Sequence, residues 1–278
     1  MAVFWSGYPI ELEDREYLRE TALPMTFAAD EVGDIPAKID PRSALKVENQ
    51  GPIGSCQGHA LTTCMEFCLY VASGGDKTQL SRGFAYLMSQ KFDGISGDSG
   101  STLSGGWKVA SQSGCCREEV YPYFGSYPRN GWRDIPAKAF EDAPHYKLRG
   151  HVAIESEEQA RLGVAAGLGI IEIGIAWGSA MTPDAKGCIK SFKPGGGGHA
   201  IVLAGWVPDD EVGAESGAGY WWLLGNSWGE RWGRDGWAYV APKAVSQMLQ
   251  HRWTTMQLLT DMHTIQPRKV DWQRIRFA

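Results

Sequence analysis

Cys56 is the residue whose surroundings most clearly favour chemistry. It ends the segment Gln50-Gly-Pro-Ile-Gly-Ser-Cys56, and an apolar pattern with the i, i+4, i+8 spacing of one buried helical face follows as far as Ala72. A thiol at a helix N-terminus lies at the positive end of the helix dipole, which favours the thiolate. We therefore predict that Cys56 is a nucleophile, provided that the rest of the chain supplies its partners.

His199 is the best candidate for a base that accepts the thiol proton. Among six histidines, it follows four glycines, residues 195–198, and opens an apolar run that predicts a strand. The glycines allow close approach of the backbone, and a strand would hold the ring rigidly. A single histidine beside a strand is more often structural, so this position alone does not define a site.

Asn226 begins the segment Asn226-Ser-Trp-Gly229, directly after a further apolar run. Its side chain can accept a hydrogen bond from one imidazole nitrogen while the other nitrogen faces the thiol. Trp228 could cover that bond and keep water from competing for it. Alone, Asn-Ser-Trp-Gly is most often a turn, so the prediction rests on the three segments together.

In this order, the three segments resemble those of the papain-like (C1) cysteine peptidases. The family's Gln-Gly-x-x-Gly-Ser-Cys segment is matched outright, and its Asn-Ser-Trp-Gly-x-x-Trp-Gly-x-x-Gly block occupies residues 226–236. Gly105-Gly106 beside Trp107, and Tyr121-Pro122-Tyr123, are weaker similarities. The resemblance covers about residues 35–245 and implies a hydrolase, specifically a thiol protease.

The resemblance implies a role for each matching residue. Cys56 would be the nucleophile, His199 the general base and acid, and Asn226 the group that orients the imidazole. Gln50 would donate its side-chain amide to the oxyanion, together with the backbone N–H of Cys56. The implied reaction is peptide-bond hydrolysis through an acyl-enzyme intermediate.

Other matching positions imply supporting roles. Trp228 would shield the histidine–asparagine pair, and Gly105 and Gly106 would bind substrate backbone by strand-like hydrogen bonds. Three positions depart from the family pattern: Gln57 replaces a frequent tryptophan, Ile53 a frequent disulfide cysteine, and Gly198 a frequent asparagine or aspartate. The loss of the disulfide cysteine suits a reducing compartment. The segment Cys56-Gln-Gly-His-Ala60 is more similar to bacterial or viral members than to lysosomal cathepsins.

The expected fold is α+β, a papain-like two-lobed fold. A helical lobe at about 50–130 would carry the cysteine, and an antiparallel, β-barrel-like lobe at about 145–245 would carry the histidine and asparagine. Together they would form a peptidase domain over 35–265. Residues 1–34 would be an N-terminal arm or short regulatory segment, and 266–278 a C-terminal tail.

Hydrophobic periodicity, together with the positions of turn-forming residues such as glycine and proline, predicts the helices and strands within these lobes. The expected helices are 12–20, 57–72, 82–91, 107–113 and 157–167. The expected strands are 170–176, 200–204, 220–224 and 236–240.

Composition excludes several classes of function. The net charge is −5, so no basic excess is available to neutralise the phosphates of a nucleic acid, and a nucleic-acid partner is not expected. No apolar run is long enough for a membrane span, and the N-terminus lacks the pattern of a secretory signal. We expect a cytoplasmic protein, or one otherwise made without signal-peptide export, of bacterial or viral origin. Membership of a larger particle stays open.

The six cysteines do not form a disulfide scaffold. Cys64 and Cys68 lie four residues apart on the predicted apolar face and suit packing. Structural roles are favoured for Cys115, Cys116 and Cys188, with a disulfide as the rival. No zinc-ligand spacing occurs, and we expect neither a metal nor a cofactor.

The expected partner is a peptide or protein substrate, and the N-terminal arm or C-terminal tail could bind a protein partner. Two alternatives to a peptidase stay open. One is a papain-fold structural or binding component of a larger assembly. The other is a cysteine-dependent acyltransferase, deamidase or isopeptidase, because the same residue types serve those reactions.

Overall fold

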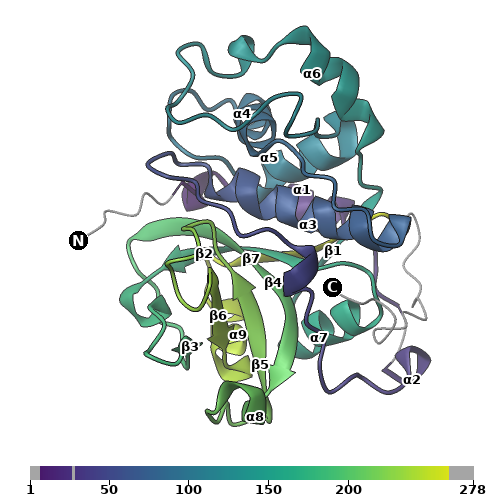
Figure 1. Ribbon diagram of the computed structural model, residues 1–278, viewed down its shortest axis with the longest axis vertical. Helices are drawn as coiled ribbons and strands as arrows, with labels where there is room; N and C mark the ends of the chain where they lie inside the picture. Colours follow the sequence, from purple (N-terminus) through teal and green to yellow (C-terminus); the bar gives the residue numbers. More distant parts are fainter. Residues whose placement is uncertain (1–6, 27–28, 263–278) are drawn as a thin grey trace.

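The structure is a computed structural model of the 278-residue chain and describes residues 7–26 and 29–262. It has two lobes, which confirms the expected α+β organisation. Helices α4, α5 and α6 lie in one lobe and the sheet in the other, while α3 runs along their boundary (Figure 1). The predicted C-terminal tail lies outside the described residues.

The predicted helices are confirmed, with small shifts at their ends. Helix α3 ends at Ser73 and is capped by Gly74, which takes the left-handed conformation that glycine adopts without steric cost. The helix expected at 107–113 begins earlier, as α5, and continues as a π-helical turn over Val109–Ser113. The described α-helices are α1 (Arg15–Thr21), α2 (Ala29–Val32), α3 (Cys56–Ser73), α4 (Arg82–Asp93), α5 (Leu103–Lys108), α6 (Ala137–Asp142), α7 (Glu157–Ala165), α8 (Asp209–Val212) and α9 (Pro242–Leu249).

The described strands form one sheet in the order β1-β7-β2-β4-β5-β6-β3. All neighbouring pairs are antiparallel except β3 and β6. The four predicted strands are confirmed as β2, β4, β5 and β6, whereas three strands were not predicted. The strands are β1 (Gly150–Ala153), β2 (Ile171–Trp177), β3 (Cys188–Ile189), β4 (Gly197–Pro208), β5 (Tyr220–Gly225), β6 (Trp237–Val240) and β7 (Thr255–Thr260).

The two faces of the sheet belong to different apolar cores. Along β4, Ala200 and Val202 pack in the core shared with the helical lobe, while Ile201 and Leu203 pack in the core on the opposite face. This alternation follows from the two-residue period of a strand. The face that carries Ala200 is therefore the one that meets α3.

All six cysteines are buried and free, so the packing predicted for Cys64 and Cys68 is confirmed. The rival prediction of a disulfide among Cys115, Cys116 and Cys188 is wrong for this structure. Within the described residues, no helix is long and apolar enough to cross a membrane.

Candidate active site

Cys56 is the first residue of α3, where the sequence placed it, and its side chain is fully buried. The backbone N–H of Ala200, on β4, donates a hydrogen bond to its Sγ at 3.4 Å. The thiol thus lies at the junction of the two lobes. His199 precedes Ala200 in the chain, so the predicted nucleophile and the predicted base are brought together.

His199 and Asn226 form the predicted pair. His199 Nε2 lies 2.8 Å from Asn226 Oδ1. That oxygen also accepts the backbone N–H of Ser227 at 2.8 Å, which fixes the orientation of the amide. Asn226 therefore holds the imidazole through Nε2. The other ring nitrogen, Nδ1, is buried without a hydrogen-bond partner among the described residues.

Tryptophan rings enclose this pair. Trp228 stacks on His199, with ring centroids 4.7 Å apart and an interplanar angle of 25°. Trp177, at the end of β2, meets the same imidazole edge-on at 5.0 Å and also contacts Trp228. Trp228 lies where the sequence predicted a shield. Trp177 was missed, because nothing in its local sequence places β2 beside β4.

Gln50 joins the segment before Cys56 to the loop that carries Asn226. Its Nε2 donates to the carbonyl of Ile53 at 2.7 Å, and its Oε1 accepts from Ser227 Oγ at 2.6 Å. The hydroxyl of Tyr123, in the Tyr-Pro-Tyr segment, donates to the Gln50 carbonyl at 2.9 Å. The amide is thus buried and oriented by both lobes.

The structure does not place Gly105 and Gly106 along the cleft as a substrate strip. Both lie inside α5, where the N–H of Gly106 bonds the carbonyl of Thr102. A Cβ at Gly106 would lie 1.9 Å from Nε2 of the buried Gln57, so this glycine permits close packing on α3. The backbone beside the cleft is instead that of Ser101, just before α5.

Residues 7–14, which we call the strap, lie across the cleft. The N–H of Tyr8 donates to the carbonyl of Gly198 at 3.3 Å, and the N–H of Ser101 donates to the carbonyl of Gly7 at 3.0 Å. A Cβ at Gly7 would lie 1.8 Å from the carbonyl oxygen of Gly54. The strap therefore forms hydrogen bonds to both walls of the cleft and passes directly against the segment that leads to Cys56.

Glu13 anchors the far end of the strap. Its carboxylate accepts the N–H groups of Leu103 and Ser104, both at 2.8 Å, and only 7% of the residue is exposed. The N–H of Asp14 donates to Ser104 Oγ at 3.3 Å. Within the N-terminal arm, the strap is thus packed into the cleft.

The covered site favours the neutral forms of both Cys56 and His199. Burial raises the pKa of Cys56 to about 11, although backbone N–H groups, those of Ala200 and Gly7 among them, oppose the shift. Burial lowers the pKa of His199 to about 4, against the effect of its bond to Asn226. The prediction of a thiolate favoured by the helix is therefore wrong for the covered cleft, because the loss of water outweighs the N–H groups.

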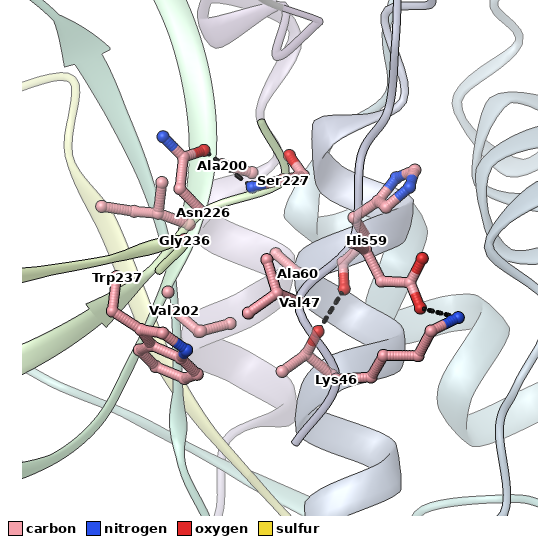
Figure 2. A pocket seen from close by; sticks show the side chains of 14 residues that line it. Lys46, Val47, His59, Ala60, Ala200, Val202, Asn226, Ser227, Gly236 and Trp237 are labelled. Atoms are coloured by element: carbon pink, nitrogen blue, oxygen red, sulfur yellow. Dashed lines mark hydrogen bonds and ion pairs between the residues drawn. The ribbon is translucent and has the colours of Figure 1, made fainter. Parts of the chain in front are cut away.

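A pocket lies beside the site, between α3 and β4 (Figure 2). Ala60 lines it from α3, Ala200 from β4, and Asn226 from the loop after β5. Its walls contain neither Cys56 nor His199. This pocket is therefore separate from the part of the cleft that the strap occupies.

Comparison with known proteins identifies the family. The sequence model of the papain family cysteine protease, peptidase C1, matches residues 35–254. The chain therefore belongs to the papain family of cysteine proteases, a family of hydrolases, as the sequence motifs predicted.

Individual relatives are distant. An uncharacterized peptidase C1-like protein, L477, of Acanthamoeba polyphaga mimivirus is 24% identical over 84% of this chain and 76% of its own. Rat procathepsin L is 25% identical over 74% of this chain and 60% of its own length. Xylellain, a cysteine protease from Xylella fastidiosa, has a similar structure, with a TM-score of 0.72 at 21% identity over 94% of this chain and 96% of its own. Viral and bacterial members, as expected, are among the matches.

Proposed function

We propose that this protein is a peptidase that hydrolyses peptide bonds through Cys56, His199 and Asn226. The observation that carries the proposal is that Asn226 holds the His199 imidazole while the neighbouring residue in the chain contacts the Cys56 sulfur. The imidazole Nε2 is held by Asn226 Oδ1 at 2.8 Å, and the next residue donates its N–H to the Cys56 sulfur. Nδ1 is left for proton exchange with the thiol.

In this mechanism, His199 Nδ1 takes the thiol proton as the Cys56 sulfur attacks the peptide carbonyl carbon. The carbonyl electrons move onto oxygen and then return as the C–N bond breaks. The leaving amine receives the proton from the imidazolium, and a thioester remains on Cys56. Water, deprotonated by the same imidazole, then hydrolyses the thioester and restores the thiol.

The oxyanion would be stabilised by the N–H of Cys56 and the side-chain amide of Gln50. The rigid mounting of Gln50 between Ile53 and Ser227 supports this role, because a fixed donor needs no reorganisation during the reaction.

The strap would act as a regulatory segment. A substrate needs the backbone positions on Gly198 and Ser101 that Tyr8 and Gly7 now occupy. Cleavage must therefore begin with strap displacement, by a partner, a cut within the strap or local opening.

The test compares wild type with Cys56→Ala on a fluorogenic peptide library, together with alkylation of Cys56 by iodoacetamide under reducing conditions. Wild-type cleavage that Cys56→Ala abolishes is the expected result. If the function of this protein in a complex survives Cys56→Ala, the protein is instead a binding component. The burial of the Cys56 thiol is the observation that favours this alternative. Products that retain a transferred acyl group, or show deamidation, would indicate the transferase or deamidase chemistry.

A further inference from the structure

Buried polar side chains form a chain of hydrogen bonds that begins at Ser101 on the cleft wall. Ser101 Oγ donates to Gln57 Oε1 at 2.9 Å, and Gln57 Nε2 donates to Glu172 Oε1 at 3.2 Å. Gln257 Nε2 donates to the other carboxyl oxygen of Glu172 at 2.8 Å. All four residues are at most 1% exposed. Glu172, on β2, therefore joins the cleft wall and α3 to β7 out of contact with solvent.

His151, on the neighbouring strand β1, connects this part of the sheet to α1. Thr21 Oγ1 donates to the Tyr17 carbonyl at 2.8 Å, so its hydroxyl hydrogen is already in use. The same oxygen lies 3.0 Å from His151 Nε2 and must accept an N–H from that nitrogen. Burial lowers the pKa of His151 to about 4, although hydrogen bonding by Gln257 opposes this shift. The ring is therefore neutral, and its Nδ1 carries a lone pair.

Two acceptors interrupt the chain between Gln257 and His151. Gln257 Oε1 and His151 Nδ1 are both buried without a hydrogen-bond partner among the described residues. Neither atom carries a hydrogen in these forms, so they cannot bond each other. Because buried polar atoms are nearly always paired in native proteins, this break needs an explanation.

The protonation state of Glu172 explains the break. Burial raises the pKa of Glu172 to about 8, although the amides of Gln257 and Gln57 lower it. Glu13 of the strap adds to the rise, and Glu172 adds to the burial that raises the pKa of Cys64. Near pH 7 the side chain is thus an acid with a proton to donate. With an amide N–H on each of its oxygens, that proton has no acceptor among the described residues.

Turning the Gln257 amide by half a turn resolves all of these conflicts. Its Oε1 then accepts the Glu172 proton, and its Nε2 then donates to His151 Nδ1. Turning the Gln57 amide instead would also provide an acceptor for the proton, but it would leave the two acceptors between Gln257 and His151 unpaired. The first arrangement is the one that pairs every atom of the chain.

We infer that protonated Glu172 is a positioning residue that joins Ser101 to α1 through one unbroken chain of hydrogen bonds, and that ionisation breaks this chain at His151. The ionised carboxylate takes N–H groups from both amides, so Gln257 turns away from His151 and α1 loses a fixed contact. Because α1 directly follows the strap, ionisation should ease strap opening. This last step rests on the proposed function of the strap, whereas the chain itself does not.

The first measurement follows the chain without any activity assay. The full chain, with nitrogen-15-labelled histidine, is titrated by NMR across the pKa of Glu172. We expect the Nδ1 resonance of His151 to shift with an apparent pKa of about 8 while the ring stays neutral, because the partner of Nδ1 changes. Glu172→Gln, which donates and accepts like the acid but cannot ionise, should show no such shift. The exposed control Glu158→Gln should titrate like wild type.

The second measurement is the rate of Cys56 alkylation by iodoacetamide, taken at each pH as the ratio of wild type to Glu172→Gln. The ratio cancels the ionisation of the thiol itself. We expect a ratio near one below the pKa of Glu172 and a rise of about 2–10-fold above it, the value of one neutral hydrogen bond. In the Glu13→Ala chain, whose strap is already released, the ratio should stay near one at every pH.

A His151 resonance that does not respond near pH 8, or that responds equally in Glu172→Gln, would overturn the chain. If Glu172→Gln does not fold, Gln257→Met takes its place, and the loss of the amide should likewise make the His151 resonance insensitive to pH in this range. A resonance shift with a constant alkylation ratio would overturn the link to the strap. If the resonance shifts but wild type cleaves no peptide, the peptidase proposal fails and the chain stands.

Discussion

Replacing Glu13 should release the strap and expose Cys56. The carboxylate accepts two N–H groups at 2.8 Å and is 7% exposed, so water screens these bonds little. A hydrogen bond to a charged group contributes about 1.5–3 kcal/mol. Taking the lower value for each bond, Glu13→Ala costs the closed state about 3 kcal/mol, which raises the open population about 100-fold.

The assay is the rate of Cys56 alkylation by iodoacetamide, followed by mass spectrometry of the modified peptide. We expect Glu13→Ala to react about 100-fold faster than wild type, since reaction requires the open state. Glu11→Ala is the matched control, because this carboxylate lies in the same segment but is exposed, and its rate should not change. Glu13→Gln should be intermediate, since its amide oxygen can still accept an N–H.

Two internal controls keep this result interpretable. The buried Cys64 must stay slow in every variant, which shows that the strap opens locally rather than by global unfolding. If folded Glu13→Ala reacts within twofold of wild type while Tyr8→Ala reacts much faster, the anchoring role of Glu13 is refuted. Equal rates for all three proteins would refute the strap as the barrier to Cys56.

Asn226→Ala should lower kcat/KM by about 10–100-fold through loss of the bond that holds His199, with KM nearly unchanged; a change confined to KM would contradict this. Gln50→Ala should lower kcat by about 100–1,000-fold if its amide binds the oxyanion, and an unchanged kcat would remove it from that role. Burial raises the pKa of Glu172 to about 8, so the folded state retains a proton that the unfolded state loses, and stability should fall as pH rises from about 4.5 through about 8. Thermal unfolding across that range should show that the Tm of wild type declines, and that Glu172→Gln reduces this decline by several degrees while the exposed control Glu158→Gln does not. If the Tm of Glu172→Gln falls with pH in parallel with that of wild type, the protonation of buried Glu172 is not the cause.

The sequence was sufficient to predict those site residues that can be recognised from residue type and local structure alone. Cys56 follows a glycine-containing segment and starts a helix, and His199 opens a strand after glycines, so local rules place both. The two residues are joined through the N–H of Ala200, a contact between elements 144 positions apart, which only the family resemblance could supply.

The strap could not be predicted because its burial depends on distant partners. Tyr8 forms a hydrogen bond with Thr255, which is 247 positions away in the chain. Strand β7 itself was not predicted, because no glycine separates it from α9. The substrate-binding role predicted for Gly105 and Gly106 was misleading for the same reason, because their surroundings also depend on residues distant in the chain. Adjacent glycines suggest an accessible backbone, yet at these positions they allow α5 to pack closely against α3 and α4, as the contact of Gly106 with Gln57 shows.

The protonation state of Cys56 depends on what covers it. At the start of α3, Cys56 has backbone N–H groups that favour the thiolate, but the strap and Ala200 bury the sulfur and raise its pKa to about 11. A proton is therefore held more tightly when the cleft is closed than when it is open. Because the thiol proton binds more tightly in the closed state, protonation of Cys56 stabilises that state relative to the open one. This stabilisation is complete below the open-state pKa of the thiol and is lost as pH rises toward about 11. Strap release and thiolate formation thus promote each other, so under the proposed function the strap would both occupy the place of the substrate and keep Cys56 in its unreactive thiol form.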